Sequence, residues 1–153
     1  MNSRLLFALA LCGLFVFTFA SNCGGNCPAN NCKTCPCGTK KSFANIQSTC
    51  SQWKGINLRC CNCIANAESS GNANAMHGNG DGSIDVGLFQ INSVNWKSCN
   101  GGRAPCGLSE NIKCAKSIYG YKKNFSPWAT CGGCGCCGSR FFAELMNSTV
   151  LEA

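Results

Sequence analysis

The chain has 153 residues, 45% of them hydrophobic, with 17 cysteines and a formal net charge of +7. This length is enough for one domain with a hydrophobic core. The Lys and Arg residues are scattered and form no aromatic and basic module of a known type, so we expect no nucleic-acid partner. The positive excess fits either attraction to an anionic polymer or a solvated basic surface.

Residues 1–20 have the pattern of a signal peptide. Arg4 precedes an apolar run without charge, Leu5 to Phe19, and small residues stand near its end. A membrane anchor is the alternative, but this run is short for a bilayer and no later stretch is long enough to span one. We therefore expect no membrane anchoring. The protein would be secreted, or delivered to the lumen of a lysosome- or phagosome-type vesicle.

The cysteines are the second dominant feature of the sequence. Removing Cys12 with the signal peptide leaves an even number, which in an exported chain predicts a disulfide framework. Clusters such as Cys60-Cys61-Asn62-Cys63 also have the spacing of thiolate metal sites. An oxidising compartment favours disulfides, so we expect no metal and no cofactor. The single histidine, His77, is expected to be exposed in a loop and without a role.

Residues 21–57 are rich in Gly, Asn and Cys and poor in apolar side chains. They cannot bury much surface, so cross-links must order them. We interpret them as a Cys-rich N-terminal extension packed on the main domain. Within it, helical spacing predicts a first helix from Phe43 to Trp53, with Phe43, Ile46, Cys50 and Trp53 on one face.

A second helix is predicted from Leu58 to Glu68. Its apolar face would comprise Leu58, Cys61, Ile64 and Ala65, with Glu68 projecting from the last turn on the same side. An acid on such a face is either a general acid or a structural group bonded to N–H donors.

A small antiparallel sheet is predicted between His77 and Asn95. The dipeptides Asn79-Gly80 and Asp81-Gly82 are strong hairpin signals, and Asp85 lies in the strand-like run that follows. A helix and a strand that face each other across a cleft, each with one carboxyl group, form the arrangement that glycoside hydrolysis needs.

The stretch from Cys63 to Trp96 resembles the animal-type (c-type) lysozymes. The resemblance rests on the motif CIANAES, followed 17 residues after the glutamate by the aspartate of DGSIDVGLFQINS, and then a Trp. Part of the pattern also resembles the bacterial lytic transglycosylases. The resemblance implies a disulfide-rich, lysozyme-like α+β fold, mainly α-helical, with a small antiparallel sheet beside the cleft. It is poor before Arg59.

The resemblance also implies the roles of the site residues. Glu68 would be the general acid and Asp85 the nucleophile or stabiliser. The substrate-binding residues would be Asn79, Gln90, Asn92 and Trp96, and the three polar ones could also keep Asp85 ionised. Asn95 stands where relatives often carry an aromatic residue, so the sugar platform would be smaller.

The C-terminal third continues the resemblance more weakly. A Gly-rich loop, Cys99 to Cys106, precedes a helix that Ser109 is expected to cap and Gly120 to end. The aspartate-rich calcium loop of some relatives is absent, so no calcium site is implied. Phe125 to Cys131 resembles the far wall of the cleft, where Trp128 would either join the core or shield the acid.

The resemblance further implies a disulfide between Cys63 and Cys131. The lysozyme-like catalytic core is expected to span residues 58–137, followed by a tail, 138–153, with a glycosylation motif at Asn147.

The function implied by these features is that of a lysozyme (EC 3.2.1.17). It would be a monomeric, bacteriolytic glycosidase that hydrolyses β-1,4 bonds between N-acetylmuramic acid and N-acetylglucosamine in bacterial peptidoglycan. One alternative is a lytic transglycosylase that uses Glu68 alone. The other is a non-catalytic, lysozyme-like binding protein. Asp85 discriminates among them, since many transglycosylases lack a second carboxylate and non-catalytic relatives lose one or both.

Overall fold

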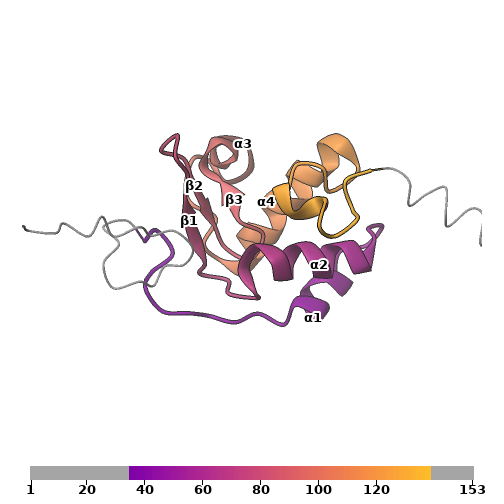
Figure 1. Ribbon diagram of the computed structural model, residues 1–153. Coiled ribbons are helices and arrows are strands. Elements are labelled where there is room, and N and C mark those ends of the chain that lie inside the picture. Colours follow the sequence, from indigo (N-terminus) through magenta and orange to yellow (C-terminus); the bar gives the residue numbers. More distant parts are fainter. Residues whose placement is uncertain (1–34, 139–153) are drawn as a thin grey trace, which may run out of the picture.

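The computed structural model describes residues 35–138. They form a mixed α+β fold with a three-stranded antiparallel sheet (Figure 1). The fold class predicted from the sequence is therefore confirmed. The elements are α1 (Ile46–Ser51), α2 (Leu58–Ser69), β1 (Met76–Gly78), β2 (Ile84–Val86), β3 (Ile91–Asn92), η1 (Ser93–Asn95), α3 (Trp96–Asn100), α4 (Leu108–Lys122) and η2 (Ala129–Cys131). The predicted signal peptide, Asn147 and almost all of the predicted tail lie outside the described residues.

Helix α2 agrees closely with the helix predicted from the sequence. It begins at Leu58 because the Asn57 side chain accepts a hydrogen bond from the Cys60 N–H at 3.0 Å. It ends where Ser70 adopts a left-handed conformation with φ of 51°. Leu58 was wrongly placed on the buried face and is 42% exposed. Six residues before Ile64, it is rotated by about 120° from the centre of that face.

The core extends N-terminal to the predicted boundary at residue 58. Cys50 and Trp53 are buried in the same cluster as Ile64 of α2. Helix α1 is shorter than predicted, because the Asn45 side chain accepts a hydrogen bond from the Ser48 N–H and sets the helix start at residue 46. Phe43 therefore lies outside the helix and is 68% exposed, contrary to the prediction.

The sheet has the order β1-β2-β3, with β2 in the centre. Asp85 of β2 pairs with His77 on β1 and with Asn92 on β3. The predicted hairpin turn is present: the Asn79 N–H donates to the Ser83 carbonyl at 2.8 Å, and Gly82 takes a φ of 83°. The sheet therefore presents Asp85 between two neighbouring strands.

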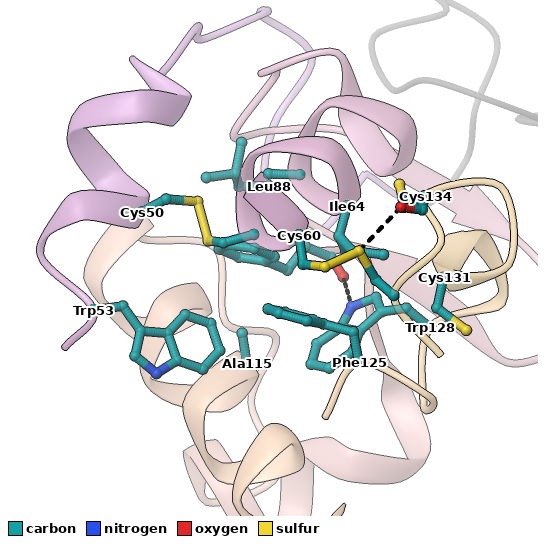
Figure 2. Close-up of a cluster of buried hydrophobic side chains, with 14 of the residues drawn as sticks. Cys50, Trp53, Cys60, Ile64, Leu88, Ala115, Phe125, Trp128, Cys131 and Cys134 are labelled. Atoms are coloured by element: carbon teal, nitrogen blue, oxygen red, sulfur yellow. Dashed lines mark hydrogen bonds between the residues drawn. A yellow bond between two sulfur atoms is a disulfide. The ribbon is translucent and has the colours of Figure 1, made fainter. Parts of the chain in front are cut away.

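Aromatic side chains and disulfide-bonded cysteines pack together in the core (Figure 2). The Trp53 ring packs edge-on against Tyr119 and Phe125, with centroids 5.3 and 5.9 Å apart. Trp128 is 5% exposed, and its indole N–H donates to the Phe89 carbonyl at 2.9 Å. Of the two places considered for Trp128, the structure supports the core, because a buried indole N–H needs such an acceptor.

Helix α4 is longer than predicted at both ends. Its N-cap is Gly107 rather than Ser109, because the Glu110 side chain accepts a hydrogen bond from the Gly107 N–H at 3.0 Å. The helix passes through Gly120 and ends at Lys122, where Lys123 takes the left-handed conformation. None of the helices in residues 35–138 is long and apolar enough to cross a membrane.

Every cysteine among the described residues is disulfide-bonded, which confirms the disulfide interpretation for that part of the chain. Six disulfides join described residues to one another: Cys37–Cys106, Cys50–Cys61, Cys60–Cys136, Cys63–Cys134, Cys99–Cys114 and Cys131–Cys137.

The predicted pairing of Cys63 with Cys131 is wrong. Cys63 bonds to Cys134, and Cys131 bonds locally to Cys137. The chain turns tightly after η2, and the Cys134 N–H donates to the Thr130 carbonyl. This turn brings Cys134, rather than Cys131, to the residue on α2.

Candidate active site

Glu68 lies in the last turn of α2 and is half-buried. Its Oε1 accepts a hydrogen bond of 2.5 Å from the hydroxyl of Thr130, which belongs to η2 and is 62 residues away in the sequence. The helix and the C-terminal segment therefore meet at this carboxyl group.

The environment of Glu68 raises the pKa of its carboxyl above the ordinary value. Burial is the largest cause, since it disfavours the charged form, and the negative charge of Asp85 acts in the same direction. Hydrogen bonds from Thr130 and the charge of His77 oppose them and lower the pKa. The net direction favours a protonated carboxyl, which is the form that can donate a proton.

Asp85 is half-buried on β2 and is held by small polar side chains. The Asn79 amide donates to Asp85 Oδ2 at 2.9 Å and to the Ser83 hydroxyl at 3.0 Å. The Ser83 hydroxyl also accepts from the Asn92 amide at 3.0 Å and donates to Asp81 at 2.7 Å. Asn79 and Asn92, which were predicted to lie around Asp85, both belong to this network.

Gln90 and Trp96 are also near the sheet, but their polar groups point to the backbone. The Gln90 amide donates to the Gly87 carbonyl at 2.9 Å. It was expected to help keep Asp85 ionised, but its amide is directed to the backbone instead. The indole N–H of Trp96 donates to the Ile91 carbonyl at 3.0 Å. The Trp96 ring itself is half-buried and packs against both hydrophobic clusters.

His77 is exposed, as expected, but it lies in β1 and not in a loop. Residues 76–78 pair with residues 84–86, which places His77 directly opposite Asp85. Residues opposite each other on neighbouring antiparallel strands project to the same face of the sheet. Within residues 35–138, no group of three or more His, Cys, Asp or Glu side chains could hold a metal ion.

Two structurally important residues were missed in the sequence. Asn111 of α4 is fully buried, and its amide donates to the carbonyls of Val86 and Pro105 while its Oδ1 accepts from the Phe89 N–H. It thereby joins α4 to the end of β2. A Cβ at Gly87 would lie 2.1 Å from the Asn111 amide nitrogen, so only glycine fits there.

Thr130 is the other missed residue. It lies in the segment predicted to form the far wall of the cleft, but only the folded chain brings its hydroxyl to Glu68. Its position two residues after Trp128, in a segment expected to line the cleft, could have indicated that Thr130 lies near Glu68.

The helix, the sheet and the two carboxyl groups define a lysozyme-like fold and site. A family model described as a lysozyme like domain matches residues 50–130, more than half of the chain. The chain therefore belongs to the lysozyme-like domain family.

Curated relatives agree with this assignment. The chain is 46% identical over 63 residues to lysozyme C of Takifugu rubripes, covering 41% of this chain and 43% of the relative. It is 35% identical over 91 residues to lysozyme C-3 of Anas platyrhynchos, covering 50% and 69% respectively. For lysozyme C of Scophthalmus maximus the identity is 42% over 92 residues, covering 51% and 63%. The chain thus spans between 43% and 69% of the length of these relatives.

Proposed function

We propose that this protein is a lysozyme that hydrolyses the β-1,4 bonds between N-acetylmuramic acid and N-acetylglucosamine in bacterial peptidoglycan. The observation that carries the proposal is the pair of carboxyl groups: Glu68 on a helix end, with a raised pKa, and Asp85 on the central strand, whose charge acts on Glu68. Relatives named lysozyme C support the same class of activity.

The chemistry follows from the different surroundings of the two groups, and lysozyme is itself the type case of this two-carboxylate scheme. Protonated Glu68 gives its proton to the glycosidic oxygen as the bond to the anomeric carbon breaks. Ionised Asp85, supported by the Asn79 amide, stabilises the sugar cation or bonds to it. Glu68, now a carboxylate, takes a proton from water as the water oxygen bonds to the anomeric carbon. Any bond from Asp85 to that carbon breaks, Asp85 leaves as a carboxylate, and the sugar is released with retention while Glu68 is again protonated.

Substrate binding is assigned to the polar and aromatic residues around the sheet: Asn79, Gln90, Asn92 and Trp96. The Trp96 ring would pack on the apolar face of a sugar. The net charge of +7 favours approach to an anionic cell wall. We propose that the protein acts as a secreted or vesicular monomer without a cofactor.

A lytic transglycosylase is the second candidate, since it needs only the acid. In that reaction the muramyl C6 hydroxyl displaces the leaving group and closes a ring in place of water. The hydrogen-bonded Asp85 favours hydrolysis over this alternative, because a second carboxylate is built into the sheet. It also speaks against a non-catalytic binding protein, which would need neither carboxyl group.

Mass spectrometry of products from purified peptidoglycan tests the proposal. We expect muropeptides with reducing muramic ends. Because hydrolysis adds a water molecule at each cleaved bond, these products should be about 18 mass units heavier than the 1,6-anhydro products of a transglycosylase. Anhydro products would establish the alternative, and an absence of products together with retained binding to peptidoglycan would favour a binding protein.

Glu68→Gln should lower the rate of cell-wall clearing by a factor on the order of hundreds or more, since Gln keeps the shape but has no proton to give. Turbidity of a cell-wall suspension measures this. Glu110→Gln is the matched control, because Gln can still cap α4 and the residue is exposed. Clearing by Glu68→Gln at the control's rate would remove Glu68 from the mechanism.

A further inference from the structure

The side chain that directly contacts the proposed acid is Thr130. Its hydroxyl donates to Glu68 Oε1 at 2.5 Å, and both residues are half-buried. A hydrogen bond to a charged carboxylate in a partly buried place contributes more than one on the surface. Thr130 therefore acts on the orientation and on the protonation of Glu68.

The segment that carries Thr130 is fixed on both sides. Two residues earlier, the Trp128 indole N–H is bonded to the Phe89 carbonyl in the core (Figure 2). Four residues later, Cys134 is covalently bonded to Cys63 of α2, five residues before Glu68. The Thr130 carbonyl accepts the Cys134 N–H at 3.2 Å. The segment that carries Thr130 is therefore cross-linked to α2, the helix that carries Glu68.

Five influences act on Glu68: burial, the side-chain and the backbone hydrogen bonds of Thr130, and the charges of Asp85 and His77. Burial raises the pKa of its carboxyl and is the largest cause, and the charge of Asp85 on β2 also raises it. Thr130 on η2 lowers the pKa, and so does His77 on β1. Thr130 is the larger of the two opposing influences, because its hydroxyl stabilises the ionised form directly.

The hydrogen bond also distinguishes the two oxygens of the carboxyl group. Because the Thr130 hydroxyl donates to Oε1, the proton of the neutral acid is left for Oε2. The freedom of the side chain to rotate is reduced at the same time. A general acid depends on this, since its proton must point to the oxygen that leaves.

We propose that Thr130 is a positioning residue for Glu68, whose hydroxyl holds Oε1 so that Oε2 carries the proton to be transferred. The proposal rests on the proposed function for its catalytic meaning. The contact itself can be tested without any substrate.

The test compares Thr130→Val, which keeps the branched shape and lacks the hydroxyl, with Thr130→Ser, which keeps the hydroxyl. Carboxyl ¹³C NMR follows the titration of Glu68, with the signal identified by its loss in Glu68→Gln. We expect the pKa of Glu68 to be higher in Thr130→Val than in the unaltered protein and restored in Thr130→Ser. An unchanged or lower pKa in Thr130→Val, or failure of Thr130→Ser to restore it, overturns the proposal.

Kinetics supply the second readout. In Thr130→Val, the basic limb of the pH profile of cell-wall clearing should move to higher pH, and the maximal rate should fall on the order of tenfold for the lost hydrogen bond. An unchanged profile and rate would overturn the positioning role. If the unaltered protein clears no cell wall, the proposed function fails, while the NMR titration still decides whether Thr130 controls Glu68.

Discussion

Glu68 and Asp85 belong to regions that are stabilised by different means. On the Glu68 side, α2 is cross-linked to the C-terminal segment by Cys60–Cys136 and Cys63–Cys134. On the Asp85 side, short strands are joined by hydrogen bonds among Asn79, Ser83 and Asn92, and by buried Asn111. In Figure 1, the three strands lie together and α2 lies beside them.

The comparison explains why the two carboxyl groups can take different roles. The cross-linked C-terminal segment contacts Glu68 through Thr130, and burial raises the pKa of the Glu68 carboxyl. Amide and hydroxyl side chains surround Asp85 instead, and Asn79 donates to it directly. The two carboxyl groups of one site thus have different surroundings, as distinct roles require.

Removal of the two cross-links on the Glu68 side should have the largest effect on stability. Replacing Cys60, Cys63, Cys134 and Cys136 with Ala frees a segment that these bonds close over 71 and 76 residues. Loop entropy predicts a loss of about 4 kcal/mol in the free energy of unfolding for one such loop, so removal of both bonds should cost more than this. Urea denaturation under non-reducing conditions measures it.

The matched control replaces Cys99 and Cys114, whose bond spans 15 residues between α3 and α4. The same reasoning predicts a loss of about 3 kcal/mol. Only the first variant should also lose the contact between Thr130 and Glu68, and with it cell-wall clearing in native buffer. Equal loss of clearing in both variants would contradict the assignment of the two bonds to the Glu68 side.

Asn111→Ala tests the hydrogen-bonded side. The change leaves the carbonyls of Val86 and Pro105 and the Phe89 N–H without their buried partner. We expect the free energy of unfolding to fall by about 3 kcal/mol, since each buried group left unpaired is costly. Lys113→Ala, on the same helix and exposed, should change it by less than about 0.5 kcal/mol. Similar stabilities of the two variants would show that the sheet does not depend on Asn111.

A smaller effect is expected in the pH dependence of stability. The pKa of Glu68 is raised in the folded state above its ordinary value of 4.5, so its contribution to stability is fully present below that value. It is lost as the pH rises through the folded pKa. Relative to Glu68→Gln, the unaltered protein should therefore become less stable as the pH rises through this range. Urea midpoints measured at a series of pH values give the difference, and a constant difference would contradict the raised pKa.

The parts of the fold that were predicted well depend on local signals. The end of α2 follows from the run after Glu68, and the turn from Asn79 to Ser83 follows from two Gly-containing dipeptides. Both are encoded within a few residues. The sequence therefore placed one carboxyl group at a helix end and the other in a strand.

The parts that were missed depend on contacts between distant residues. Thr130 reaches Glu68 across 62 residues, and Asn111 reaches Phe89 across 22. The pairing of Cys63 depends on the turn that follows Thr130, which no local pattern specified. The start of α4 was misplaced because the Glu110 side chain, rather than Ser109, supplies the cap.

We propose that Glu68 and Asp85 act together in a retaining hydrolysis. Proton NMR of peptidoglycan fragments during early digestion records which anomer of the new reducing end forms first. We predict that the β anomer forms first, and that Asp85→Asn loses most activity while it still binds sugar oligomers. Initial formation of the α anomer, or full activity of Asp85→Asn, would contradict the claim.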